Sequence, residues 1–267
     1  MDKIHLPVIN LTPTMRCNLK CKLCGVMVAQ YSYRPHITAE EFAAMLKAVF
    51  EIVDGVDKLQ ITGGEPLLHT DLPEMLEECL RYSTQFDVLQ LFTNCAVPFR
   101  PELVDVLQKH KDRIVLHLSD YGIKPELVEE LLPMLERYGI SHRYLKYYGD
   151  EQYMGGWVDQ GDFVKHGRSD TELNKVFAAC SHVVRGGSWY VRGGQMHWCG
   201  RSIRGTEVGK IPLLQGDYLD IFNGTINERR GKLQELRNAK YITACDYCNG
   251  LYGTEDDDLR QPAGEQI

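Results

Sequence analysis

Short apolar runs alternate with helical patterns over residues 8–147, and this alternation limits the fold more than any other feature of the chain. Apolar runs of this length are typical of buried strands. The expected strands cover residues 8–11, 58–62, 88–92, 114–118 and 143–147. Strands that alternate with amphipathic helices predict an α/β fold with a parallel sheet, and its active loops are expected at the carboxyl ends of the strands.

The helices between these strands begin at recognisable residues. Thr38 is followed three positions later by Glu41, which is the pattern of a capping box. Pro101 stands where a first-turn proline is tolerated, and a further helix is expected from about Pro125 to Tyr138. Each expected helix carries a single apolar stripe, as a helix packed on a sheet requires.

Three cysteines follow the first strand with the spacing C-x3-C-x2-C: Cys17, Cys21 and Cys24. Three thiolates can hold three irons of a [4Fe–4S] cube and leave the fourth iron open for a substrate. Electron-carrying clusters usually have four cysteines, so three favour chemistry at the open iron. The alternative is a zinc site that takes a fourth ligand from His5 or His36.

A glycine-rich turn, Gly63-Gly64-Glu65-Pro66, follows the second strand. Two glycines let the backbone pass close to a ligand, and the carboxylate and carbonyls can accept hydrogen bonds from an ammonium group. With both motifs in order, each after an expected strand, the chain resembles the radical S-adenosylmethionine (radical SAM) superfamily. In that family the open iron binds the amino and carboxylate groups of SAM, and the glycine-rich turn contacts the ammonium.

The resemblance implies a partial (β/α)6 TIM-type barrel with the reaction at its carboxyl-end rim. It also implies a set of SAM contacts on that rim: Leu23, Gly63, Gly64, Glu65, Pro66, Asn94 and Ser119. The barrel core is expected over residues 1–150.

The chain changes character after residue 148. Residues 149–170 are polar and glycine-rich, which predicts a long loop over the barrel mouth, with room for a last barrel strand within 151–179. Residues 189–191 and 195–198 flank Gly193-Gly194 and predict a hairpin. Four further cysteines suit either a structural zinc or a fully ligated [4Fe–4S] cluster: Cys180, Cys199, Cys245 and Cys248.

Their order, C-x13-G-x4-C followed by C-x2-C, resembles the twitch subdomain, a shortened SPASM domain that holds one auxiliary [4Fe–4S] cluster. The order of all seven cysteines is similar to that of the aminocyclitol (2-deoxy-scyllo-inosamine) dehydrogenases. The resemblance implies a small C-terminal α+β subdomain over residues 180–253. An acidic polar tail is expected over 254–267, and its run Glu255-Asp256-Asp257-Asp258 is expected to be solvated.

The composition is that of a globular protein with no membrane or nucleic-acid partner. The net charge of −7 is opposite to the basic footprint of non-specific nucleic-acid binding. No apolar run approaches the roughly 20 residues of a membrane span, and the first residues lack the apolar region of a secretion signal. Nine cysteines in such a chain favour metal ligands over disulfides and a reducing cytoplasm.

A second cluster beside a SAM-binding one favours oxidation. The 5′-deoxyadenosyl radical abstracts hydrogen from a substrate carbon, and deprotonation of a hydroxyl on that carbon gives a ketyl radical that a nearby cluster can oxidise to a ketone. The protein must then supply orientation, a base and exclusion of water. The candidate bases are Lys165, His166 and Arg168 in the loop, and His117 and Asp120 on the fourth strand.

Cys95 supports a different outcome. It stands where radical SAM proteins often have a Thr-Asn-Gly-like segment, and a thiol there can return hydrogen to the opposite face of a substrate radical. That reaction would be an epimerisation. A small buried residue is the plainer interpretation of Cys95, because free cysteine is among the most buried residue types.

Arginines crowd around the later cysteines: Arg185, Arg192, Arg201 and Arg204. They can grip a phosphate or carboxylate, or balance the negative charge of a thiolate-bound cluster. We expect a radical SAM oxidoreductase that acts on a sugar or cyclitol, with a flavodoxin- or ferredoxin-type reductant. The alternatives are a sugar epimerase, a maturase of ribosomal peptides, for whose leader-binding module Cys17 leaves no room, and a non-catalytic zinc or iron–sulfur protein.

Overall fold

The computed structural model describes residues 3–153, 157–250 and 261–267. The described residues build one eight-stranded sheet in the order β5-β4-β3-β2-β1-β6-β7-β8. Its strands are β1 (His5–Thr14), β2 (Gly55–Gly63), β3 (Phe86–Thr93), β4 (Ile114–Asp120), β5 (His142–Lys146), β6 (Ser188–Arg192), β7 (Gln195–His197) and β8 (Tyr218–Asp220). The expected α/β class and the five expected strands are confirmed, with boundaries that differ by up to three residues.

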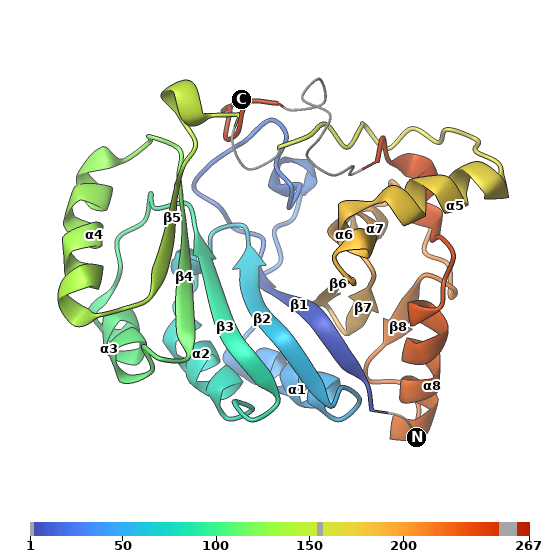
Figure 1. Cartoon of the computed structure of the whole chain (residues 1–267), viewed down its shortest axis with the longest axis horizontal. Helices are drawn as coiled ribbons and strands as arrows, with labels where there is room; N and C mark the ends of the chain where they lie inside the picture. The colour runs from blue at the N-terminus through green and yellow to red at the C-terminus, as the bar shows by residue number, and fades with distance from the viewer. Residues whose placement is uncertain (1–2, 154–156, 251–260) are drawn as a thin grey trace.

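Helices cover the parallel half of the sheet and gather at both of its edges (Figure 1). They are α1 (Ala39–Phe50), α2 (Leu72–Leu80), α3 (Pro101–Lys109), α4 (Pro125–Tyr138), α5 (Asp170–Ala179), α6 (Ser181–Val184), α7 (Gly200–Glu207) and α8 (Ile226–Arg237). Short 3-10 turns are η1 (Val28–Gln30), η2 (Pro66–Leu68), η3 (Gly149–Glu151) and η4 (Thr243–Tyr247). No helix in the described ranges is both long and apolar enough to cross a membrane.

Local sequence signals fixed the helix starts. The Thr38 hydroxyl accepts from Glu41 N at 3.1 Å while the Glu41 carboxylate accepts from Thr38 N at 2.7 Å, so the capping box is confirmed. Pro101 and Pro125 are the first residues of α3 and α4. Glycine ends α4, because Gly139 takes the left-handed conformation at φ 65°.

The sixth parallel strand lies at the opposite edge from the one that a regular (β/α)6 barrel would use. A last strand within 151–179 would pair with β5, but the described part of that range holds helix α5 instead. Strand β6 pairs in parallel with β1, from Val8 opposite Ser188 to Leu11 opposite Val191. The physical reason is burial. The apolar strand β6 is buried when it pairs with β1, whereas the residues that follow β5 are polar and form no apolar strand that could pair with β5.

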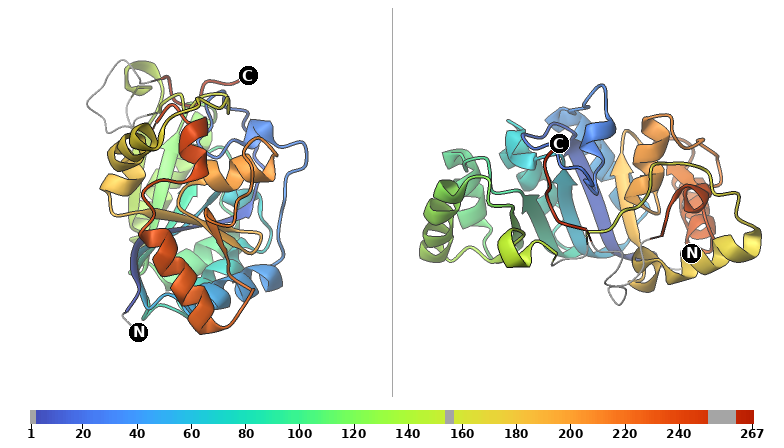
Figure 2. Two further views of the ribbon diagram at one scale, coloured as in Figure 1. Left: turned by 90° about the vertical axis from the view of Figure 1, so that its right-hand side faces the viewer. Right: turned by 90° about the horizontal axis from the view of Figure 1, so that it is seen from above.

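The predicted hairpin is confirmed, since β6 and β7 pair antiparallel across the Gly193-Gly194 turn. It extends the barrel sheet, so residues 180–250 are joined to the first half through shared strands. Trp189 in β6 is 1% exposed and packs against Trp198, whose indole donates to Leu236 O of α8 at 2.5 Å. Arg229 of α8 reaches Glu51 after α1 at 2.9 Å, which ties the C-terminal helix to the barrel half. Figure 2 shows the same sheet from the side and from above.

Candidate active site

The first cysteine loop leaves the carboxyl end of β1 and is fixed by backbone hydrogen bonds. Met15 N donates to Pro35 O at 2.7 Å, and Met27 N donates to Cys24 O at 2.8 Å. Cys17, Cys21 and Cys24 therefore lie on one short, anchored loop between β1 and α1.

The last residues of the chain also hold this loop. Lys22 N donates to Glu265 O at 2.7 Å and Ile267 N donates to Lys20 O at 2.9 Å, which makes a short antiparallel pairing. The Gln266 side chain donates to Cys21 Sγ at 3.2 Å. Residues 261–267 of the predicted polar tail thus contact the loop, while its acidic run Glu255–Asp258, which we expect to be solvated, lies outside the described ranges. A single chain gives no local signal for such a long-range pairing.

The glycine-rich turn after β2 sits directly against that loop. Gly64 N donates to Thr14 O at 2.9 Å and Glu65 N donates to Arg16 O at 2.8 Å. A β-carbon on Gly64 would lie 2.1 Å from Arg16 O. Gly63 takes φ 144°, and a β-carbon there would lie 2.4 Å from Thr14 O. The glycines thus allow close approach, and part of what they approach is the cysteine-loop backbone.

Glu65 is a buried carboxylate that joins the ends of two strands. It is 1% exposed and accepts from Asn94 N at 2.7 Å and from Leu67 N at 3.1 Å. Burial raises its pKa to about 7, against the opposing effect of these hydrogen bonds. Its carboxylate fixes β3 relative to the turn, so its backbone, together with that of Gly63 and Gly64, is the part left to contact a ligand.

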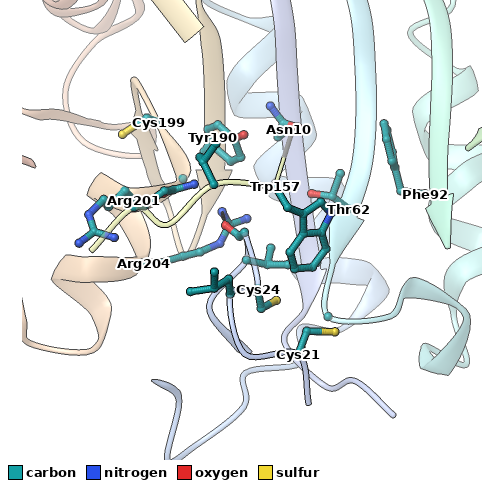
Figure 3. A pocket seen from close by; sticks show the side chains of 18 of the residues that line it. Asn10, Cys21, Cys24, Thr62, Phe92, Trp157, Tyr190, Cys199, Arg201 and Arg204 are labelled. Carbon is teal, nitrogen blue, oxygen red and sulfur yellow. Dashed lines mark hydrogen bonds between the residues drawn. The ribbon is translucent and has the colours of Figure 1, made fainter. Parts of the chain in front are cut away.

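A cavity of about 450 Å³ opens above these strand ends. All three first-loop cysteines line it, and so do all seven predicted SAM contacts: Leu23, Gly63, Gly64, Glu65, Pro66, Asn94 and Ser119. Its opposite wall holds the four later cysteines: Cys180, Cys199, Cys245 and Cys248. Figure 3 shows Cys21 and Cys24 on one side of the space and Cys199 on the other. The two cysteine sets therefore share one cavity.

Short elements of the C-terminal part position the second set. Cys180 separates α5 from α6, Cys199 is the N-cap of α7, and Cys245 and Cys248 lie within and directly after η4. The Arg168 guanidinium donates to Cys245 O at 2.7 Å and to Cys248 O at 2.9 Å. These bonds hold the C-x2-C turn in place.

Backbone amides point at several of the sulfurs. Leu19 N donates to Cys17 Sγ at 3.4 Å, Ser202 N to Cys199 Sγ at 3.3 Å, and Gly250 N to Cys248 Sγ at 3.3 Å. Hydrogen bonds to sulfur stabilise thiolates and tune the potential of a bound cluster.

A family model of the radical SAM superfamily matches residues 11–143, which is about half of the chain and covers both the first cysteine loop and the glycine-rich turn. The chain belongs to the radical SAM superfamily. Membership implies a [4Fe–4S] cluster and SAM, and the three cysteines of the first loop are the residues that would hold that cluster.

The curated relatives of this radical SAM protein are similar to its barrel half. GTP 3′,8-cyclase of Aquifex aeolicus is 37% identical over 137 residues, which are 49% of this chain and 41% of the relative. A probable GTP 3′,8-cyclase of Methanopyrus kandleri is 38% identical over 86 residues, 32% of this chain and 26% of the relative. The chain thus spans less than half the length of these relatives.

Two solved structures share the fold over nearly the whole radical SAM chain. BtrN in complex with AdoMet and 2-DOIA has a TM-score of 0.56 at 15% identity, covering 98% of this chain and 100% of that one. Native anSMEcpe with bound AdoMet has a TM-score of 0.56 at 16% identity, covering 96% and 93%. At this identity the likeness concerns the fold alone.

The electrostatics of both cysteine sets suit a bound cationic group. Burial raises the pKa of Cys17 to about 11, and Glu65, Cys24 and Cys21 raise it further. Burial likewise raises the pKa of Cys245 to about 12, with Cys248 among the further causes. Buried thiols that would repel one another as thiolates become stable anions when metal is bound, because the metal supplies the opposite charge.

Within the described ranges, no three Cys, His, Asp or Glu side chains converge as the ligands of a single metal ion would. A cube suits wider spacing than one ion, because each of its thiolates binds a different iron. The cysteines of the first loop, with an open side toward the cavity, fit the family's cluster on these grounds.

The predicted catalytic side chains are not brought together at this cavity. His166 is exposed, and its backbone N donates to Asp246 O at 2.9 Å. Arg168 holds the C-x2-C turn as described above. Asp120 is 3% exposed, and its carboxylate accepts from Gly122 N at 2.8 Å and from the Tyr144 hydroxyl at 2.7 Å.

Cys95 lies outside the shared cavity. It takes a left-handed conformation at φ 60°, is 2% exposed, and lines a separate cavity of about 420 Å³ between α3 and α4. The turn after β3 carries its side chain away from the cysteine sets, and this direction cannot be read from a strand boundary.

Several cavity residues were missed by the sequence patterns. Asn10 in β1 and Thr62 in β2 face the cavity from its floor, and Thr62 Oγ1 has no hydrogen-bond partner among the described residues. Tyr121 follows β4 and meets Trp157 edge-on with ring centroids 5.8 Å apart. A polar residue at an inward position of an otherwise apolar strand is the signal that could have revealed Asn10 and Thr62.

Proposed function

We propose that this radical SAM enzyme is a dehydrogenase that oxidises a secondary alcohol of a sugar or cyclitol, with Cys180, Cys199, Cys245 and Cys248 holding a second [4Fe–4S] cluster. The observation that carries the proposal is the shared cavity, in which three cysteines face four. An open three-cysteine site and a closed four-cysteine site across one space suit a radical reaction followed by removal of one electron.

The reaction balances with SAM as the oxidant: SAM takes up the two electrons of the alcohol and leaves as methionine and 5′-deoxyadenosine, and the electron that starts each turnover would come from the reductant. When bound, the two clusters and SAM would supply a 5′-deoxyadenosyl radical and a place for one electron. A carbon-bound hydrogen of the alcohol ends on 5′-deoxyadenosine, the hydroxyl proton leaves to a base, and the second electron leaves to the four-cysteine site. The carbon–oxygen double bond of a ketone forms in the same step.

The protein's own residues would orient the substrate, exclude water from it and accept its hydroxyl proton. Asn10 and Thr62 offer an amide and a hydroxyl on the cavity floor, which are groups that bind hydroxyls. Trp157 and Tyr190 supply aromatic walls. His182 lines the cavity and is our proposed proton acceptor: burial together with Arg185 and Arg204 lowers its pKa to about 4, so its imidazole is neutral and can accept a proton. None of the predicted bases lines the cavity: Lys165, His166, Arg168, His117 and Asp120.

The same geometry weakens the alternatives. Epimerisation was based on Cys95, which lines a different cavity. The GTP 3′,8-cyclases are similar over the barrel half, so they support SAM chemistry and leave the substrate open. For the same chemistry we propose a flavodoxin- or ferredoxin-type reductant and a reducing cytoplasm, where iron-bound thiolates persist.

The test is the iron, sulfide and zinc content of protein purified without oxygen, together with reductive cleavage of SAM. We expect about eight irons, falling to about four in a triple alanine variant of the first loop and in a Cys199→Ala variant. Only the first variant should lose SAM cleavage. A panel of deuterated polyols would then reveal transfer of deuterium into 5′-deoxyadenosine and formation of a ketone.

Other metal contents would change the proposal in defined ways. Four irons plus one zinc would mean that the second site holds no electron acceptor, and this would contradict the proposed dehydrogenase. Zinc alone in both variants would contradict radical chemistry altogether.

A further inference from the structure

Arg204 is a buried guanidinium that faces the shared cavity. It lies in α7, is 3% exposed, and is among the residues that line the space between the cysteine sets. Figure 3 shows it reaching between Cys24 and Tyr190. A charged group in such a place is costly unless it has a partner.

The other arginines at this wall already have fixed roles. Arg168 binds the carbonyls of Cys245 and Cys248. Arg201 donates to Tyr247 O at 2.8 Å, and it stacks on Phe163 at 4.0 Å.

Arg192 forms an ion pair with Glu207, and Glu207 also accepts from the Tyr31 hydroxyl. Glu207 lies in the same helix as Arg204, but its carboxylate is already bonded to Arg192 and Tyr31 and forms no ion pair with Arg204.

Arg204 makes much weaker contacts. Its guanidinium donates to Gly25 O at 3.4 Å and stacks on Tyr190 at 5.1 Å. No carboxylate in the described ranges forms an ion pair with it. Its planar fork is therefore available to a ligand.

The local sequence makes room for this placement. A β-carbon on Gly200 would lie 2.1 Å from the Arg204 guanidinium, so glycine one turn earlier lets the side chain fold back toward the cavity. Two other arginines, Arg201 and Arg168, are the cationic neighbours of Cys248.

We propose that Arg204 is an anion-binding residue that takes a carboxylate or phosphate group of a molecule bound in the shared cavity. A guanidinium binds either group through two parallel hydrogen bonds. Two sources fit this chemistry: the carboxylate of SAM, and an acidic group on the second substrate. The second source would narrow the proposed substrate to a phosphorylated or carboxylated polyol, and that part rests on the proposed function.

Binding measurements test this without turnover. Titration calorimetry of the anaerobic full-length protein would use SAM in one arm and inorganic phosphate, inorganic pyrophosphate and malonate in the other. The variants are Arg204→Met, which keeps the chain length, and Arg204→Lys, which keeps the charge. Lys210→Met is the control, because Lys210 is exposed, carries the same charge and does not line the cavity.

A charged hydrogen-bond pair is worth about 1.5–3 kcal/mol, so Arg204→Met should weaken binding of the relevant anion by about 10- to 100-fold. Arg204→Lys should retain part of the affinity, and Lys210→Met should match the wild type. Weaker SAM binding alone assigns the site to the SAM carboxylate, whereas loss of phosphate, pyrophosphate or malonate binding alone assigns it to the second substrate.

Unchanged affinity in both arms, in variants with normal iron content, would overturn the inference. Failure of the wild type to bind SAM would instead count against the proposed function, so the two failures are distinguishable.

Discussion

Replacing Gly64 with alanine tests how the glycine-rich turn and the cysteine loop depend on each other. A β-carbon at this position would stand 2.1 Å from Arg16 O and 2.6 Å from Arg16 C. Both neighbours are backbone atoms of the loop that carries Cys17, so they cannot rotate away as a side chain would. The two segments must separate by about 1 Å, which is the size of misplacement that can cost about 100-fold in rate.

The stability cost can be worked from the same contacts. Separation would break the hydrogen bonds from Gly64 N to Thr14 O and from Glu65 N to Arg16 O, now 2.9 and 2.8 Å long. At about 1 kcal/mol each, their loss would lower the free energy of unfolding by about 2 kcal/mol. For a chain of this size the melting temperature should fall by about 4–8 °C.

The assay is formation of 5′-deoxyadenosine from SAM and dithionite, measured alongside iron content and thermal unfolding. Gly64→Ala should cleave SAM at least about 100-fold more slowly than the wild type at 20 °C, where the fold persists. Gly231→Ala is the matched control: it lies in α8 with nothing within 4 Å of the added carbon, and alanine there should add about 0.5–1 kcal/mol. SAM cleavage within threefold of the wild type in Gly64→Ala would refute the reasoning.

Three further changes have defined outcomes. Cys95→Ala should lower stability by about 1 kcal/mol and leave SAM cleavage and product formation unchanged, because its thiol is buried outside the shared cavity. If the Cys95→Ala variant lost product formation while SAM cleavage stayed intact, Cys95 would be supported as the hydrogen-atom donor of an epimerase. Arg168→Met should release about four irons, because the carbonyls of Cys245 and Cys248 lose their donor, while the exposed Arg185→Met should release none. Burial lowers the pKa of His117 from 6.5 to about 4 in the folded protein. Below pH 6.5 the unfolded chain therefore binds a proton at His117 that the folded protein does not, and the free energy of unfolding falls as the pH drops. Between pH 6.5 and 5.5, urea titrations should show the wild type losing up to about 1 kcal/mol more than His117→Leu, and equal losses would contradict a neutral, partly buried imidazole.

Features set by neighbours in the sequence were predictable. The capping box at Thr38 and Glu41 depends on two residues three positions apart, and the turn at Gly193-Gly194 depends on its own dihedral angles. The seven cysteines could be divided into two sets because Cys17, Cys21 and Cys24 stand close together in one loop, far along the chain from the other four.

Features set by distant partners were not predictable. The choice of β1 as the partner of β6 depends on which sheet edge offers a buried surface, and that is a property of the assembled sheet. The direction of the Cys95 side chain depends on one left-handed residue after β3. His182 reaches the cavity from α6, a helix of four residues that is too short to give a periodic signal.

The pairing of residues 261–267 with the first cysteine loop makes this end of the chain a reporter position. A nitroxide or fluorine label near position 267 would sit beside the loop that carries Cys21, whereas the N-terminal end of β1 lies at the other end of the sheet (Figure 1). A chemical-shift change of the fluorine label would follow iron loading in real time, without SAM, reductant or substrate, whereas broadening of the nitroxide would require the reduced, paramagnetic cluster. An affinity tag would accordingly disturb the loop less when it precedes β1.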